Sequence, residues 1–130
     1  MTTGDQYEAW LADMDDQLDV LRAQVPTLDG SPGSIAALEA WLLERFPTFE
    51  STSEPTAAAD LDLAARYIGE LLRTRGGMRW TLQDNAERAW FGLPVVTDAR
   101  GTLCPLTLAT ATTDRRTGQY LSGVLTRRLT

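Results

Sequence analysis

The stretch from residue 67 to residue 80 carries the side chains best suited to binding chemistry in this sequence. Tyr67, Glu70, Arg79 and Trp80 offer a phenol, a carboxylate, a guanidinium and an indole. The charged groups can hold polar parts of a ligand, and the aromatic rings can anchor an apolar side chain. We therefore identify these four residues as a candidate binding site for a partner or ligand, in a groove between a helix and the hairpin that follows it.

Glu70 also has an ordinary interpretation. It lies one helical turn after Arg66 and close to Arg73. An exposed ion pair at this spacing contributes under about 1 kcal/mol to stability. A surface ion pair and a docking residue are therefore both open interpretations of Glu70.

Histidine is absent from the 130 residues, and all 12 basic residues are arginine. The chain therefore cannot build a Ser-His-Asp or Cys-His nucleophile, an HExxH zinc site or an imidazole acid or base. The single cysteine, Cys104, lies between Leu103 and Pro105 and is expected to be a small buried hydrophobe. Without histidine, an enzyme is less favoured than a binding protein. An enzyme stays open as an interpretation, because chemistry based on carboxylates and arginine needs no histidine.

Motifs for metal ions, nucleotides and nucleic acids are weak. Residues 15–19, DDQLD, match a short magnesium-binding pattern, but acidic residues at this spacing are typical of a solvated helix face. The glycines of residues 69–77 lack the GxGxxG spacing of a phosphate-binding loop. We therefore predict no metal site and no cofactor. Arginines around Trp80 could form a nucleic-acid surface, but an isoelectric point near 4.5 disfavours that partner.

Hydrophobic periodicity predicts three helices in the first part of the chain. Residues 5–24 and residues 35–46 form amphipathic helices, and a proline follows each of them. A third helix is predicted to begin at about Ser53, before Glu54 and Pro55, and to run through residues 57–75, up to a double glycine. Its inner face is predicted to consist of Leu61, Ala64, Ala65, Ile68, Leu71 and Leu72.

Gly69 lies inside the third helix, where glycine lowers helix propensity by about 1 kcal/mol relative to alanine. Ala65 lies one turn earlier, so the two residues form a smooth strip on the helix surface. We expect another backbone or a flat ring to pack closely on this strip. Gly76 is predicted to adopt the left-handed conformation that ends the helix.

After the third helix the hydrophobic period changes to an alternating one. Residues 78–83 predict a strand with one buried face, and residues 88–96 predict its antiparallel partner. Residues 97–101 are predicted as a turn, followed by a short strand or a helix to about residue 111. A final helix is expected to begin near residue 113 or 114.

The length indicates one α+β domain over residues 1–130. Residues 1–47 are predicted as an acidic helical hairpin, and residues 53–130 as a helix, a β-hairpin and a C-terminal helix. About four helices are expected to pack on a two- or three-stranded antiparallel sheet. No apolar run reaches the 18 residues of a membrane helix, and the N-terminal residues lack a signal-peptide pattern, so we expect a cytoplasmic protein.

The two halves of the chain differ in charge. Residues 1–65 hold 2 arginines and 13 acidic residues, whereas residues 66–130 hold 10 arginines and 5 acidic residues. The halves can attract each other within the fold, or the first half can present an acidic face to a basic partner. The four tryptophans are expected mainly in the core, with one or two exposed edges serving as interface anchors.

Four short segments carry a resemblance: residues 67–70 (YIGE), 76–80 (GGMRW) and 92–96 (GLPVV), and Pro105 before a closing helix. This order resembles a loose group of small uncharacterised bacterial proteins, some of which look like accessory or immunity proteins that neutralise a partner. The resemblance covers about residues 60–125. It implies a helix followed by a small sheet, and it implies no catalytic residues.

These observations together favour a protein-binding accessory or immunity-like module with a protein partner. The alternative is a small-ligand-binding protein or an enzyme that uses carboxylate and arginine groups. The chain is expected to be a monomer or a homodimer, with no membrane association.

Overall fold

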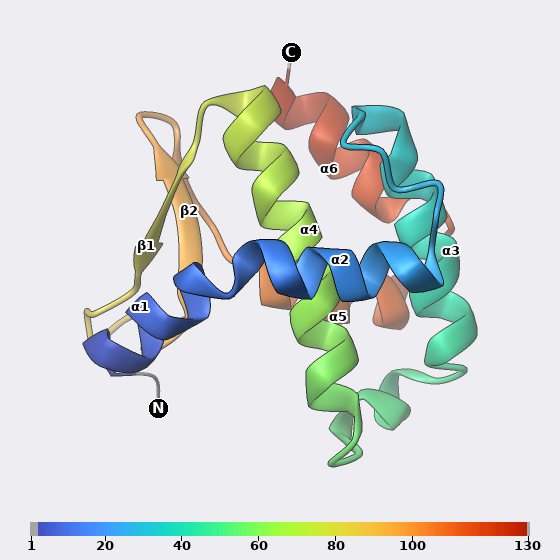
Figure 1. Ribbon diagram of the computed structural model, residues 1–130, viewed down its shortest axis with the longest axis horizontal. Coiled ribbons are helices and arrows are strands. Elements are labelled where there is room, and N and C mark those ends of the chain that lie inside the picture. Colours follow the sequence, from blue (N-terminus) through green and yellow to red (C-terminus); the bar gives the residue numbers. More distant parts are fainter. Residues whose placement is uncertain (1–2, 130) are drawn as a thin grey trace.

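The computed structural model describes residues 3–129 and shows an α+β fold (Figure 1). Six α-helices and a three-stranded antiparallel sheet lie in these residues, whereas about four helices were predicted. The helices are α1 (Gly4–Ala12), α2 (Met14–Gln24), α3 (Ile35–Arg45), α4 (Ala57–Gly76), α5 (Pro105–Arg115) and α6 (Tyr120–Leu129). The strands are β1 (Arg79–Leu82), β2 (Pro94–Asp98) and β3 (Gly101–Leu103), and short 3-10 turns occur at η1 (Pro32–Ser34) and η2 (Phe49–Ser53).

The single helix predicted over residues 5–24 is divided at Asp13, which ends α1 and begins α2. The φ and ψ angles of Asp13 are −90° and 4°, outside the α-helical range. Aspartate favours such positions because its side chain competes for local hydrogen bonds, and here its carboxylate accepts a bond from Gln17 Nε2 at 2.9 Å. The break lets α1 lie beside β1 while α2 crosses α4 (Figure 1).

The C-terminal region also differs from the prediction. The segment left open as a strand or a helix forms β3 and then α5, and the final helix begins at Tyr120 rather than near residue 113. Thr113 belongs to α5, where its hydroxyl donates to the carbonyl oxygen of Thr110 at 2.7 Å. Arg116 then ends α5 in the left-handed conformation, with φ of 53°. The chain therefore builds two short helices here, which was one of the two alternatives left open, and the second begins later than predicted.

Helix α4 is the centre of the fold, and it contacts α2, α3, α5, α6 and two strands. All six apolar positions predicted for its inner face are buried, which confirms that part of the prediction. The helix begins at Ala57 rather than near Ser53, because residues 49–53 form the 3-10 turn η2. It ends one residue later than predicted, because Gly77 rather than Gly76 adopts the left-handed conformation, with φ of 70°. The backbone N–H of Met78 then donates to the carbonyl oxygen of Leu72 at 3.2 Å, which closes the last turn.

The sheet has the order β1-β2-β3, and Trp80 of β1 lies opposite Val96 of β2. The partner strand predicted over residues 88–96 begins six residues later, at Pro94. Residues 88–93 form turns instead, in which the N–H of Phe91 donates to the carbonyl oxygen of Arg88 at 3.1 Å. An aromatic and branched composition alone could not distinguish these turns from a strand.

Two charged side chains join helices that are distant in sequence. The Glu39 carboxylate of α3 is fully buried and accepts hydrogen bonds from the backbone N–H groups of Tyr120 and Leu121, at 3.0 and 2.8 Å. It thereby caps the N-terminus of α6. Arg116 donates to the carbonyl oxygens of Phe46 and Leu43 and so caps the C-terminal end of α3. Neither contact was predicted from the sequence.

Candidate docking site

The indole ring of Trp80 lies directly over Gly69. A methyl group built on Gly69 would overlap the ring atoms Cζ2 and Cη2 of Trp80, so only glycine leaves room for the ring. The indole Nε1 donates to Oε2 of Glu70 at 2.9 Å. Close packing of a flat ring on the Gly69 strip is therefore confirmed, and it fixes β1 against α4.

A second tryptophan holds Trp80 from the other side. The rings of Trp10 and Trp80 meet edge to face, with centroids 4.9 Å apart and an interplanar angle of 76°. Trp10 Nε1 donates to Asp62 at 2.8 Å, and the Arg66 guanidinium lies 4.3 Å from the Trp10 ring centroid. These contacts attach α1 to α4 and leave Trp80 little freedom to move.

Glu70 forms its ion pair with Arg73, at 2.8 Å between Oε2 and Nε, while Arg66 pairs with Asp62 instead. A second bond joins Arg73 Nη2 to the other carboxylate oxygen at 3.0 Å. Partial burial raises the pKa of Glu70, but the hydrogen bonds from Arg73 and Trp80 outweigh burial and hold the pKa below its ordinary value of 4.5. Glu70 is therefore an ionised structural carboxylate that orients Trp80.

This pKa shift predicts a pH dependence of stability. Because the folded-state pKa is lowered, the contribution of Glu70 is fully present above about pH 4.5 and is lost as the pH falls through the folded-state value. The effect is under about 1 kcal/mol because Arg73 is half-exposed. Urea unfolding of wild type and Glu70→Gln should show a stability difference at pH 6 that shrinks towards pH 3.

Glu44→Gln is the charge-matched control, since Glu44 is exposed on α3. Its difference from wild type should not reproduce the low-pH convergence seen with Glu70→Gln. If the two variants converge with wild type in the same way, Glu70 does not hold Trp80 through its charge.

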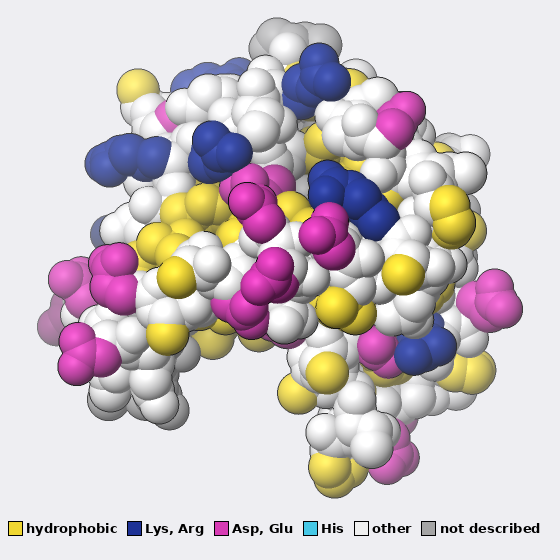
Figure 2. Space-filling model, in the orientation of Figure 1, with side chains coloured by type: hydrophobic (Ala, Val, Ile, Leu, Met, Phe, Trp, Pro, Cys, Tyr) yellow, Lys and Arg dark blue, Asp and Glu magenta, His cyan; other side chains and the backbone are white. Residues whose placement is uncertain are grey.

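A hollow of about 380 Å³ opens beside Trp80, between the α1–α2 bend, α4 and β1. We call it the Trp80 hollow, and it is lined by Leu11, Ala12, Met14, Asp15, Glu70, Arg73, Arg79 and Trp80. Figure 2 shows hydrophobic side chains exposed in this region, with arginines above them and acidic side chains beside and below them. Three of the four predicted site residues, Glu70, Arg79 and Trp80, therefore line one hollow. It lies between the helix and the hairpin, where the groove was predicted.

Tyr67, the fourth predicted site residue, is not part of the Trp80 hollow. It is buried, its hydroxyl lies 2.5 Å from Ser34 Oγ, and it accepts a bond from the backbone N–H of Gly30 at 3.0 Å. Tyr67 and Glu70 both line a separate, smaller hollow of about 160 Å³, between α2, α4 and Gly30. The geometry therefore gives Tyr67 a structural contact with the 30–34 loop.

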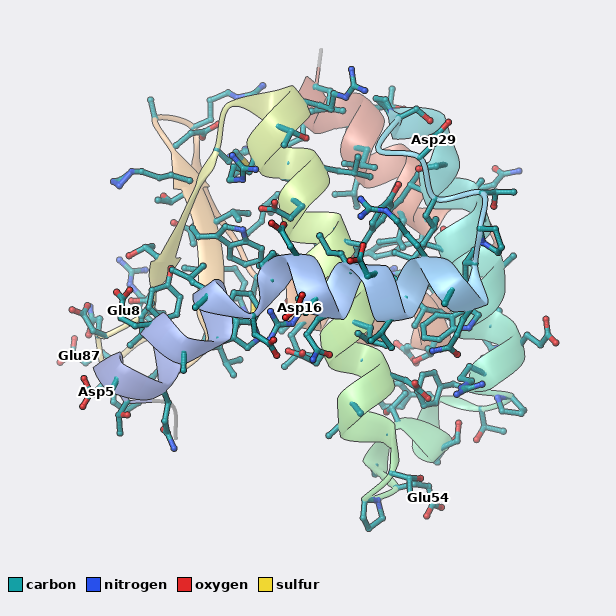
Figure 3. The ribbon with its side chains drawn as sticks, in the orientation of Figure 1. Asp5, Glu8, Asp16, Asp29, Glu54 and Glu87 are labelled. Carbon is teal, nitrogen blue, oxygen red and sulfur yellow. The ribbon has the colours of Figure 1, made fainter. Side chains whose placement is uncertain are left out.

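The charges around the Trp80 hollow are not balanced within the described residues. Glu70 and Arg73 form a close ion pair, and Arg73 also senses the more distant charge of Asp15. The side chains of Arg79 and Asp15 form no hydrogen bond or close ion pair in residues 3–129. Figure 3 shows further acids on the two N-terminal helices, with Asp16 on α2 and Asp5 and Glu8 on α1. Asp15 was predicted as part of a solvated helix face, and the excess of acids in the first half left an acidic face for a basic partner open as well.

A second open hollow, of about 670 Å³, lies where residues 83–90 meet β3. Trp90 and Arg88 line it together with polar residues, and Phe91 nearby is 40% exposed. All four tryptophans are only partly buried, so more of them keep an exposed edge than the one or two expected. Trp10, Trp41 and Trp80 pack against the core, whereas Trp90 does not belong to that cluster.

Other chemistry has little support in the described residues. Burial raises the pKa of the Cys104 thiol, which is 1% exposed, so Cys104 is the small buried hydrophobe that the sequence predicted. Residues 3–129 hold no group of three acidic or cysteine side chains arranged to bind a metal ion. No helix in the same residues is long and apolar enough to cross a membrane.

Comparisons with known families, curated proteins and solved structures found no match to this chain.

Proposed function

We propose that this protein is a small protein-binding accessory module of the immunity-like kind, which docks its partner at the Trp80 hollow. The observation that carries the proposal is a fixed aromatic floor between flanks of opposite charge. Trp80 is held by Gly69, Trp10 and Glu70, so it can bury apolar surface of a partner with little loss of side-chain entropy. Arg79 and Asp15 remain available to pair with groups of the partner.

Binding is better supported than catalysis at this place. A general acid or base must exchange a proton during the reaction, and its pKa should lie near the working pH. The Glu70 pKa is instead lowered, and both carboxylate oxygens already accept hydrogen bonds from Arg73 or Trp80. The Glu70 carboxylate therefore supports the architecture and is poorly suited to catalysis.

The small-ligand alternative is favoured only by the volume of the hollow, which lies at the lower end of the roughly 300–1,000 Å³ typical of ligand pockets. A thermal-shift screen of nucleotides, acyl metabolites and amino acids tests it. A ligand present at about 100 times its Kd should stabilise the protein by about 2.7 kcal/mol. Our proposal predicts no such shift from any of these compounds.

Reversing the charge of Arg79 should weaken partner binding at least about tenfold, since a favourable ion pair becomes a repulsion. The measurement is quantitative capture from a lysate of the native host, with tagged wild type, Arg79→Glu and the control Arg127→Glu. Arg127 is exposed on α6 and does not line the hollow. A partner retained by wild type and the control but lost by Arg79→Glu supports the proposal. A partner that both variants retain equally contradicts docking at the hollow.

A further inference from the structure

We propose that the partner docks through one segment with a defined charge order: an apolar side chain that enters the Trp80 hollow, a carboxylate on the Arg79 side and basic residues on the α2 side. This inference rests on the proposed function and adds the chemistry of the partner to it. Three features of the hollow carry it, namely its residual charges, its shape and its apolar floor.

The residual charges define the two flanks. The pair of Glu70 and Arg73 is internally satisfied, so the cation left on one side is Arg79. The opposite side carries Asp15, followed along α2 by Asp16 and Asp19, and all three are exposed. Asp19 lies 3.9 Å from Arg22, whereas neither Asp15 nor Asp16 lies within ion-pair distance of an arginine in residues 3–129. The complement of this surface is a carboxylate at one end and two or more cations at the other.

The floor between the flanks selects an apolar group. Leu11 and Trp80 are partly exposed in the hollow, and Met14 lies beneath them with 7% of its surface exposed. The Glu70 carboxylate already accepts hydrogen bonds from Arg73 and Trp80, so a polar group placed on this floor, away from Arg79 and Asp15, would lose hydrogen bonds to water without gaining a partner there. An aliphatic or aromatic side chain suffers no such loss.

The shape of the surface disfavours a second copy of this chain as the occupant. Copies related by a two-fold axis through the hollow would set one concave surface against the other and leave both unfilled. A partner must instead present a convex element, such as a helix or an extended loop, whose apolar side chain projects into the space. The occupant is therefore a different protein.

The experiment uses the full chain and a displayed library of random 15-residue peptides. Wild type should enrich peptides with one apolar residue between an acidic end and a basic end. Arg79→Glu should enrich peptides in which the acidic end has become basic, and Asp15→Arg should favour acidic residues at the other end. Arg127→Glu, on α6, should enrich the same peptides as wild type.

Two results would overturn the inference: failure of wild type to enrich any charge order, or the same peptides for wild type and both hollow variants. If capture of the native partner still depends on Arg79 in either case, the proposed function survives and only the charge order is wrong. Sedimentation equilibrium completes the test. A dimer that Arg79→Glu dissociates would make a second copy the occupant and would also overturn the inference.

Discussion

Glu39→Ala will lower the free energy of unfolding by about 3–4 kcal/mol. The Glu39 carboxylate is fully buried and accepts both of its backbone hydrogen bonds from the first turn of α6. Alanine leaves the N–H groups of Tyr120 and Leu121 without acceptors and opens a space between α3 and α6. Denaturant unfolding followed by circular dichroism measures the change directly.

Glu44→Ala is the matched control, because it removes the same side chain from an exposed position of the same helix. It should change stability by no more than about 0.5 kcal/mol. Glu39→Gln keeps one acceptor oxygen and should fall between the other two variants. Equal stabilities for Glu39→Ala and Glu44→Ala would mean that α6 does not depend on the buried carboxylate.

Gly69→Ala will destabilise the protein by up to about 2 kcal/mol, although alanine is the better helix former. The new methyl group overlaps the Trp80 ring, and the ring cannot shift freely because Trp10 and Glu70 hold it. Overpacking of this kind costs about 1–3 kcal/mol, against a gain of about 1 kcal/mol in helix propensity. Gly123→Ala in α6 is the matched control, since a methyl group there meets no atom within 4 Å. It should stabilise the protein by about 0.5–1 kcal/mol.

The effect of Gly69→Ala on stability should change sign when the Trp80 ring is removed. In a Trp80→Ala background, Gly69→Ala gains helix propensity without overlap and should stabilise the protein by about 1 kcal/mol. Urea unfolding of the four proteins of this cycle gives the coupling energy between residues 69 and 80. A coupling near zero would show that Trp80 does not lie on Gly69.

Local patterns in the sequence predicted the inner face of α4 and the close packing at Gly69. Both depend on helical periodicity, which residues within a few turns determine by themselves. The division at Asp13 and the late start of β2 were missed because they depend on contacts across the fold. Asp13 separates two helices with different packing partners, and residues 88–93 satisfy strand composition while forming turns.

At the candidate site, too, local sequence patterns predicted the near contacts but missed those between distant parts of the chain. Glu70, Arg79 and Trp80 are joined by a short helix-to-strand connection, so their sequence spacing was enough to bring them together. Tyr67 lies one turn before Glu70, but a loop 37 residues away covers it through the N–H of Gly30. Glu39 contacts α6 across 81 and 82 residues, and no local pattern can reveal such a buried cap.

Site-specific photo-crosslinking tests the docking of a protein at the Trp80 hollow most directly. A photoreactive phenylalanine analogue replaces Leu11, which lines the hollow, or Phe49, which is 45% exposed on η2 and lies outside it. After irradiation in the native host, the account predicts one discrete adduct with another protein from position 11 and none from position 49. No adduct from position 11, or the same adducts from both positions, would contradict it.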